Sequence, residues 1–209
     1  MSVYSSIADV KLHLVDMSLD SSYDAVLTML VLNASRAIDR YTKRSPNAYL
    51  VEDDEVRYFG GSGSHELWVD EMADEPTLVE VAETGQVDNS TGSGGDYTTY
   101  AASEYFLLPE NADKKGIPYE VIELDRLYGT KTVWYRYPRS VKITAKFGYA
   151  ITVPETIAEA TIIQAGSWFK RGQQGFMQNS AQTRFGQLQY KQLDPDVLEI
   201  VKHYMRTTV

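Results

Sequence analysis

The chain has 209 residues, of which 43% are hydrophobic and 23% charged, so its composition is that of a folded protein with a core and not that of a disordered one. It contains no cysteine, which excludes disulfide bonds and thiolate metal sites. The start of the sequence lacks the features of a secretion signal, and no apolar run approaches the ~20 residues of a membrane span, so we expect no contact with a membrane.

The first predicted elements are helices. From Ser21 to Thr42 apolar residues recur every three or four positions on one stripe, which predicts an amphipathic helix. Asp20 or Ser21 can cap its first amides. Ser45-Pro46 is expected to end it, because a residue before proline avoids the helical conformation. A shorter helix is expected from about Ser6 to Val15.

Between Tyr49 and Phe147 the apolar residues tend to alternate with polar ones, as they do in half-buried strands. The predicted strands cover residues 55–59, 66–69, 77–81, 105–108, 121–124 and 141–144. Gly60 to Ser64 is expected to form a hairpin connection, and Asp88 to Gly95 a surface loop. The region is therefore predicted to be an antiparallel β-sandwich or a partly open barrel.

The net charge of −9 is concentrated in this β-rich region. Residues 49–149 hold nineteen acidic and nine basic residues, whereas the segments on either side are nearly balanced. Proteins that grip nucleic acid cluster lysine and arginine against the phosphates, and an acidic surface repels them. We therefore do not expect sequence-specific DNA binding.

The β-rich region stops at Phe147 and gives way to a long helix. Gly148 lets the backbone bend, Pro154 lies near the first helical position with its φ already set, and Glu155 favours the positive end of the helix. The helix, about 155–171, is apolar on two sides and so needs two packing partners, the first of which is the 21–42 helix. The predicted fold class is α+β: a helical bundle of residues 1–48 and 150–209, with residues 49–149 as an acidic β-rich insertion.

The segment 172–193 has an unusual composition. It holds seven glutamines, three glycines and no acidic residue, and it lacks a period that would let it pack alone. We expect it to become ordered on a partner. A final helix is predicted to start at Asp194, a suitable N-cap, with Pro195 in its first turn.

Several local motifs occur in a fixed order along the chain. They are Ala37–Tyr41, Tyr58–Gly63, Leu67–Val69, Tyr97 with Leu107–Asn111, Val141–Tyr149, Val153-Pro154, Trp168–Arg171, Leu193–Val197 and Tyr204–Arg206. The most diagnostic run is a strand closed by Gly-Tyr, then Val-Pro, then an Ala-rich helix that ends in an aromatic and basic cluster. In this order they resemble the head–tail connector (adaptor or head-completion) proteins of long-tailed bacteriophages, although the acidic β region departs from the smallest, almost wholly helical members.

The resemblance implies a structural virion protein of the neck, without catalysis or cofactor and assembled in the host cytoplasm. Such a protein forms a homo-oligomeric ring, usually of twelve subunits, beneath the portal protein of the capsid. The ring extends the DNA channel and offers a platform to the next tail-side connector or tail protein. Acidic walls fit this role, because passing double-stranded DNA is repelled by them instead of being held.

We expect the end of the long helix and the segment after it to contact the portal or a neighbouring subunit, because aromatic residues and arginine are over-represented at interfaces. The predicted interface residues are Trp168, Phe169, Lys170, Arg171, Phe176, Arg184, Phe185, Tyr190 and Lys191.

No motif predicts a catalytic or metal site. The glycine-rich turns lack the Lys-Ser/Thr of a phosphate loop, and His13, His65 and His203 show no ligand spacing. The acidic runs near 52–55 and 70–75 are expected to be solvated. Three alternatives stay open: a carbohydrate- or receptor-binding module that displays Tyr97, Tyr100 and Trp134, a carboxylate-pair hydrolase, and a tail-completion component of a neighbouring ring.

Overall fold

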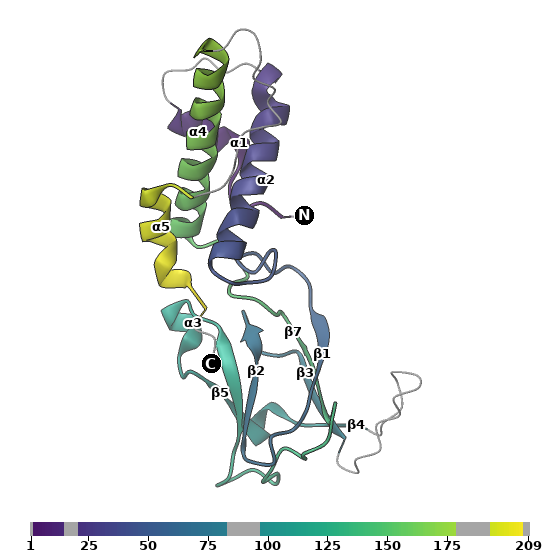
Figure 1. Ribbon diagram of the computed structural model, residues 1–209. Coiled ribbons are helices and arrows are strands. Elements are labelled where there is room, and N and C mark those ends of the chain that lie inside the picture. Colours follow the sequence, from purple (N-terminus) through teal and green to yellow (C-terminus); the bar gives the residue numbers. More distant parts are fainter. Residues whose placement is uncertain (1, 15–20, 83–96, 179–192, 207–209) are drawn as a thin grey trace. The chain divides into compact units, whose positions relative to one another are not determined.

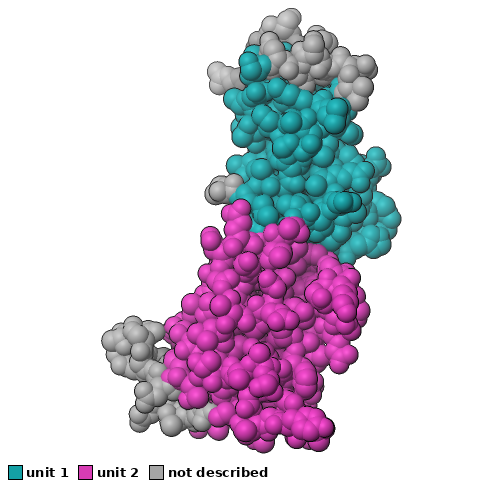
Figure 2. Space-filling view, turned by 180° about the vertical axis from the view of Figure 1, so that it is seen from behind, with its two compact units in different colours: residues 1–50, 153–209 teal, residues 51–152 magenta. Residues whose placement is uncertain are grey.

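A computed structural model describes residues 2–14, 21–82, 97–178 and 193–206. The chain divides into two compact units, residues 1–50 with 153–209 and residues 51–152 (Figure 2). We call them the helical unit and the β unit. Helices and two antiparallel sheets together confirm the predicted α+β class. Among the described helices, none combines the length and apolar character that a membrane span requires.

The helical unit is built around two long helices, α2 (Asp24–Tyr41) and α4 (Glu155–Gln178), which pack side by side (Figure 1). Around them lie α1 (Ile7–His13), α5 (Pro195–Val201) and the 3-10 turns η1 (Ser21–Tyr23) and η4 (Lys202–Tyr204). The pairing of helices far apart in sequence agrees with the prediction. The core residues that join α1, α2 and α4 are Val10, Leu14, Leu27, Leu30, Val31, Ala34, Ala165, Trp168 and Phe169.

The helix ends differ from the predicted ones for local reasons. Helix α2 follows a 3-10 turn and has no side-chain cap at Tyr23, whereas Ser21 lies in that turn and Asp20 lies outside the described residues. It ends at Tyr41, before the predicted proline, where the Thr42 hydroxyl donates to the Ile38 carbonyl at 3.0 Å. In contrast, α1 starts with a reciprocal capping box between Ser6 and Asp9.

Helix α4 runs seven residues beyond the predicted end at Arg171. Helices α1 and α5 of the same chain also pack on α4, and so they cover its second apolar side. The close approach of α1 is possible at Gly166, where an added Cβ would lie 3.3 Å from the His13 ring. Among the apolar residues of this helix, Phe169 is therefore buried, whereas Ile162 and Ile163 are half-buried and leave some apolar surface exposed.

The β unit contains two antiparallel sheets. The four-stranded sheet has the order β1 (Glu55–Phe59), β7 (Val141–Ala145), β3 (Leu78–Ala82), β4 (Tyr97–Thr99), and the three-stranded sheet has the order β2 (Glu66–Met72), β6 (Tyr119–Leu124), β5 (Tyr105–Leu108). Short elements η2 (Ala102–Glu104) and α3 (Ala112–Lys115) flank β5. Inward-facing residues of both sheets share one core, which includes Leu67, Val79, Val81, Ile122, Leu124, Val141 and Ile143. Of the two predicted alternatives, a β-sandwich and a partly open barrel, the structure therefore shows the sandwich.

The prediction that Gly60 to Ser64 forms a hairpin connection is wrong. Strand β1 pairs with β7 and β2 pairs with β6, so the turn carries the chain from one sheet to the other. Gly61 is needed for a different reason: an added Cβ would lie 2.0 Å from the Tyr135 carbonyl oxygen. The Gly61 amide donates to the Ser140 hydroxyl at 2.8 Å, which fixes this close approach.

Candidate assembly surfaces

The predicted interface begins at residues 168–171 of α4, and there the structure separates core residues from surface residues. Trp168 and Phe169 are 4% and 3% exposed and belong to the core of the helical unit. The Phe169 ring packs edge-on against Tyr23 at 5.6 Å. These two aromatic side chains therefore hold this part of α4 against the core of the helical unit. Lys170 and Arg171 face solvent.

Arg171 connects α4 to the start of α5. Its guanidinium forms an ion pair with Asp194 and donates to the Ser167 hydroxyl at 3.2 Å. The Asp194 amide donates to the side-chain oxygen of the fully buried Gln164 at 2.8 Å. Asp194 occupies the N-cap position of α5, but its carboxylate makes no capping hydrogen bond. The residue thus holds the two helices together through Arg171 and Gln164.

The remaining predicted interface residues are placed only in part. Phe176 lies in α4, and its side chain is outside the described part of the structure. Arg184, Phe185, Tyr190 and Lys191 lie outside the described residues altogether. The nine residues are therefore not shown to form one surface, and their contact with a portal or neighbour stays a prediction.

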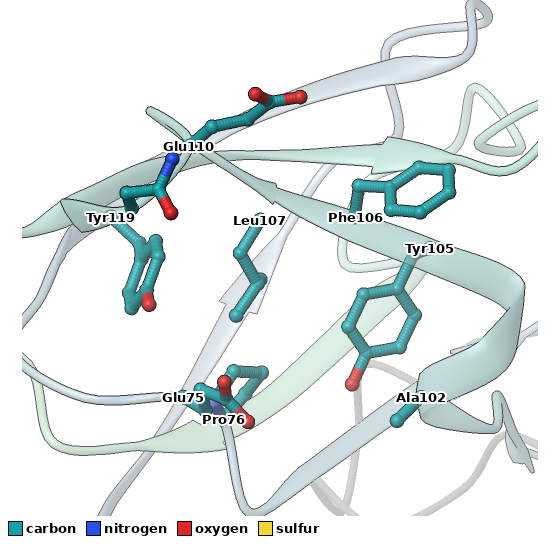
Figure 3. A pocket seen from close by; sticks show the side chains of 9 residues that line it. Glu75, Pro76, Ala102, Tyr105, Phe106, Leu107, Glu110 and Tyr119 are labelled. Atoms are coloured by element: carbon teal, nitrogen blue, oxygen red, sulfur yellow. The ribbon is translucent and has the colours of Figure 1, made fainter. Parts of the chain in front are cut away.

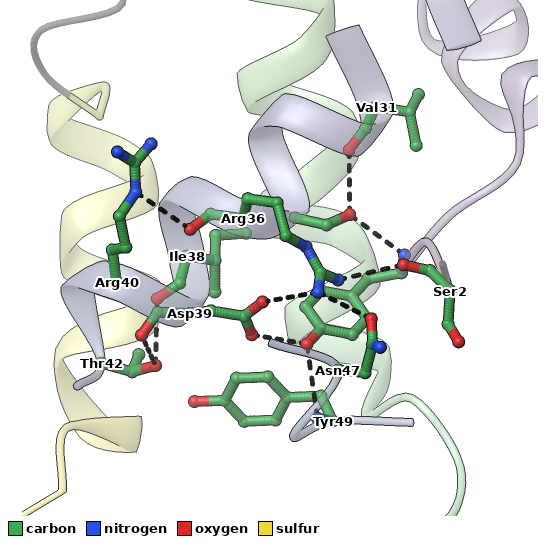
Figure 4. A network of polar contacts seen from close by, with 11 residues as sticks. Ser2, Val31, Arg36, Ile38, Asp39, Arg40, Thr42, Asn47 and Tyr49 are labelled. Atoms are coloured by element: carbon green, nitrogen blue, oxygen red, sulfur yellow. Dashed lines mark hydrogen bonds and ion pairs between the residues drawn. The ribbon is translucent and has the colours of Figure 1, made fainter. Parts of the chain in front are cut away.

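A buried polar network in the helical unit was missed by the sequence analysis (Figure 4). The Tyr4 hydroxyl donates to the Asp39 carboxylate, which is 2% exposed and lies 3.3 Å from the Arg36 guanidinium. Arg36 also donates to the Asn47 side chain at 2.6 Å and to the Ser2 carbonyl at 3.0 Å. The network ties the start of the chain and the loop after α2 to that helix.

Burial dominates the electrostatics of this network. It raises the pKa of Asp39, against the lowering effect of the Tyr4 hydrogen bond and the Arg36 charge. It also raises the pKa of Tyr4 far above its ordinary value, with the Asp39 hydrogen bond adding to the effect. The available signal was Asp39 itself, a charged residue next to Ile38 on the side of the helix that faces the core.

The outer face of the three-stranded sheet exposes two large aromatic side chains. Trp68 on β2 is 60% exposed and Phe106 on β5 is 56% exposed. Both alternate with core residues, since Leu67 and Tyr105 beside them are buried. Exposed aromatic side chains of this kind are typical of surfaces that bind another protein.

The β unit also contains a hollow of about 380 Å³ beside β5. Figure 3 shows Leu107 between the rings of Tyr105 and Tyr119, with Glu75 and Pro76 facing them. Burial raises the pKa of both tyrosines, and nearby carboxylates add to the effect, Glu75 at Tyr105 and Asp113 with Glu75 at Tyr119. The hollow can accept a polar group. Its two carboxylates, Glu75 and Glu110, are exposed, and so neither has the burial that a general acid of a hydrolase needs.

Of the three aromatic residues predicted to display a glycan site, two are buried. Trp134 is fully buried, and its indole donates to the His65 carbonyl at 2.9 Å and to the Ile122 carbonyl at 3.2 Å. Tyr100 is 3% exposed and stacks on Trp134 at 5.8 Å. Tyr97 is half-buried and donates to the Arg139 carbonyl. The prediction is wrong for Tyr100 and Trp134, because these two aromatics belong to the core of the β unit.

Most residues of the two acidic runs face solvent, and several meet basic or hydroxyl groups of the same unit. Residues 52–55 are exposed, and the Asp54 carboxylate accepts from Thr77 at 2.5 Å. Arg57 lies 2.9 Å from Asp70 and 2.8 Å from Glu55. The acids of the 52–55 run and Asp74 and Glu75 are exposed as predicted, whereas the prediction is wrong for Glu71, which is 6% exposed and buried.

No protein-family model matches the chain, and no curated protein matches it in sequence. Solved structures match it in fold. A chain from the neck of an empty gene transfer agent particle, computed with C6 symmetry, has a TM-score of 0.56 and 14% identity, and the match covers 100% of this chain and 94% of that one. A chain from the neck of the native particle, computed with C12 symmetry, has a TM-score of 0.52 and 16% identity over 97% of this chain and 89% of that one.

A third match is a chain of the virion of the native gene transfer agent particle. It has a TM-score of 0.51 and 15% identity over 100% of this chain and 94% of that one. The matches span the helical unit and the inserted β unit alike. The complete two-unit architecture is therefore shared with these chains.

Proposed function

We propose that this protein is a structural component of the neck of a phage-like particle, where identical copies form a ring between the portal and the tail. The observation that carries the proposal is the fold match to chains of gene transfer agent necks, which extends over 100% of this chain. Those necks were computed with C6 and C12 symmetry, which suits a ring of twelve copies. The motif order that resembles head–tail connectors supports the same function independently.

The proposed contacts involve the predicted interface residues. Lys170 is exposed on α4, and the segment after this helix is rich in glutamine and carries Arg184, Phe185, Tyr190 and Lys191. We assign these residues, with Phe176, to contact with the portal or a neighbouring copy. Trp168, Phe169 and Arg171 act on this contact indirectly. The two aromatics hold this part of α4 in the core, and Arg171 ties it to Asp194.

The ring extends the DNA channel without gripping the duplex. The chain carries a net charge of −9, and its acidic excess lies in residues 49–149. Such a surface releases few counterions from DNA and repels the phosphate backbone. In a fluorescence anisotropy titration at 50 mM salt, a labelled duplex is expected to show no binding.

The experiment that tests the proposal mixes the purified chain with the portal protein of its own particle. Mass photometry and negative-stain electron microscopy are expected to show a ring of copies bound to one end of the portal. The isolated chain can be monomeric, since a partner supplies the ordering energy. A stable monomer that ignores the portal at micromolar concentration contradicts the proposal.

A second contact surface is favoured by the exposed aromatics of the β unit. We assign the face with Trp68 and Phe106 to a tail-side neighbour in the neck, with a receptor as the alternative partner. A doubly substituted Trp68→Ser, Phe106→Ser chain is expected to bind the portal normally and to lose the tail-side protein. If the substituted chain still binds the tail-side protein as the parent does, the face with Trp68 and Phe106 is not the contact surface.

A further inference from the structure

One group of side chains in the β unit has a composition typical of a metal site and was not predicted to be one. His65, Glu66 and Glu123 each offer a ligand atom, and these atoms lie within 4.8 Å of one another. The His65 Nε2 atom is 3.7 Å from the nearer carboxylate oxygen of each glutamate. In the described part of the chain, this is the one group of histidine and acidic residues with such spacing.

Two residues of this group form a cross-strand pair of like charges. Glu66 on β2 and Glu123 on β6 stand directly opposite each other in the antiparallel register, where like charges destabilise a sheet. Elsewhere Glu80 on β3 stands opposite Lys142 on β7 and pairs with it at 2.6 Å. Among the described residues, neither Glu66 nor Glu123 forms an ion pair with a lysine or arginine. The two carboxylates therefore have no lysine or arginine beside them to offset their mutual repulsion.

The backbone under these side chains is fixed by independent contacts. The His65 carbonyl accepts from the Leu124 amide at 2.9 Å and from the buried indole of Trp134 at 2.9 Å. The Glu66 carbonyl accepts from the hydroxyls of Ser62 and Ser64 at 2.5 and 3.1 Å. Glu123 lies in the central strand of its sheet. A cation would meet ligands whose main chain is already in place, so little conformational entropy is lost on binding.

The ligand types select the ion. An imidazole with two carboxylates suits Zn²⁺, which binds nitrogen and oxygen at about 2.0–2.2 Å in a tetrahedral arrangement, so that its ligand atoms lie about 3.3 Å apart. The two histidine–glutamate separations are 3.7 Å, and all three ligand atoms lie within 4.8 Å of one another, so small side-chain movements would bring them to this spacing. Calcium and magnesium prefer all-oxygen sites, and the imidazole disfavours them. Three protein ligands leave the fourth position to water or another group.

We propose that His65, Glu66 and Glu123 bind one Zn²⁺ ion, which joins strand β2 to strand β6. The ion offsets the repulsion between the paired glutamates and stabilises the β unit. The inference does not depend on the proposed neck function, because it concerns the isolated chain.

The test uses the full chain, which is favourable because it has no cysteine and only three histidines. Isothermal titration with zinc chloride is expected to give one ion per chain. Zinc at a hundredfold excess over its dissociation constant is expected to raise the unfolding temperature of the β unit by about 5 °C or more. His65→Ala and Glu123→Gln are each expected to weaken binding by more than about tenfold. The matched control His203→Ala, at an exposed histidine of the helical unit, is expected to bind zinc as the parent does.

Glu123→Gln also separates a metal site from a merely structural group. Without zinc this variant is expected to unfold at a higher temperature than the parent, because the repulsion with Glu66 is gone. With zinc the order is expected to reverse. An absence of stoichiometric binding in the parent, or undiminished zinc binding in His65→Ala, overturns the proposal.

Discussion

At the scale of single residues, the stability of the helical unit depends on one buried carboxylate and on the partners that compensate its charge. Asp39 is 2% exposed and is held by Tyr4 and Arg36. Removal of one partner from a buried pair leaves the other charge without compensation, which costs about 3 kcal/mol. We therefore expect Asp39→Ala to lower the free energy of unfolding of the helical unit by about that amount in a urea titration. Glu199→Ala, at a fully exposed ion pair with Lys202, is the control and is expected to change nothing measurable. Equal effects of the two substitutions would contradict the role given to the network.

The tyrosines beside this network give the unit a dependence on alkaline pH. Burial raises the pKa of Tyr49 to about 12, whereas an unfolded tyrosine ionises near 10. A folded-state pKa above the unfolded one means that the contribution to stability is complete below pH ~10 and is lost as the pH rises toward 12. The free energy of unfolding is expected to fall across this range, by up to about 1.4 kcal/mol per pH unit for each such phenol. Tyr49→Phe is expected to flatten the profile, and an unchanged slope would contradict this account.

Gly61 and Gly60 offer a test of close packing in neighbouring positions. An added Cβ at Gly61 would lie 2.0 Å from the Tyr135 carbonyl oxygen, whereas at Gly60 the nearest atom would be 3.5 Å away. Gly61→Ala is expected to destabilise the β unit by about 1–3 kcal/mol through overpacking, and Gly60→Ala to leave it nearly unchanged. Thermal unfolding of both variants measures the difference. A Gly61→Ala chain as stable as the parent would show that the 60–64 turn is not held against Tyr135.

At the scale of elements, α4 is the helix on which both the fold and the proposed assembly depend. Ile162 packs against the core of the helical unit, whereas Ile163 is half-buried and lies outside that cluster. We expect Ile163→Ser to keep the unfolding temperature within about 3 °C of the parent and to weaken ring formation on the portal. Ile162→Ser is expected to lower the unfolding temperature instead. Mass photometry with the portal and a thermal scan separate these outcomes, and normal assembly of Ile163→Ser would exclude α4 from the ring contact.

The elements themselves were largely predictable, because each carries a local signal. The three- and four-residue spacing located α2 and α4, and alternation located most strands, since one face of each element is buried. The pairing of strands was not predictable, because β1 and β2 are adjacent in sequence and yet join different sheets. The Tyr4–Asp39 contact and the His65–Glu66–Glu123 group bring together residues with no common local pattern. The same limit explains the buried Trp134, which was expected at the surface.

At the scale of the whole molecule, the inserted β unit gives the protein its charge and much of its exposed aromatic surface. The fold match to the gene transfer agent chains extends over both the helical unit and the β unit. The proposed function gives the two units separate tasks: the helical unit is proposed to supply the contacts between copies, and the β unit to meet the tail-side partner.

The most direct measurement of the central claim is a reconstruction of the neck of the intact particle that contains this protein. We predict a ring of identical copies between the portal and the tail, each fitted by both units, with α4 and the segment after it at the portal or at the neighbouring copy. A neck in which no density accommodates this two-unit fold, or a particle that carries the protein elsewhere, would contradict the account.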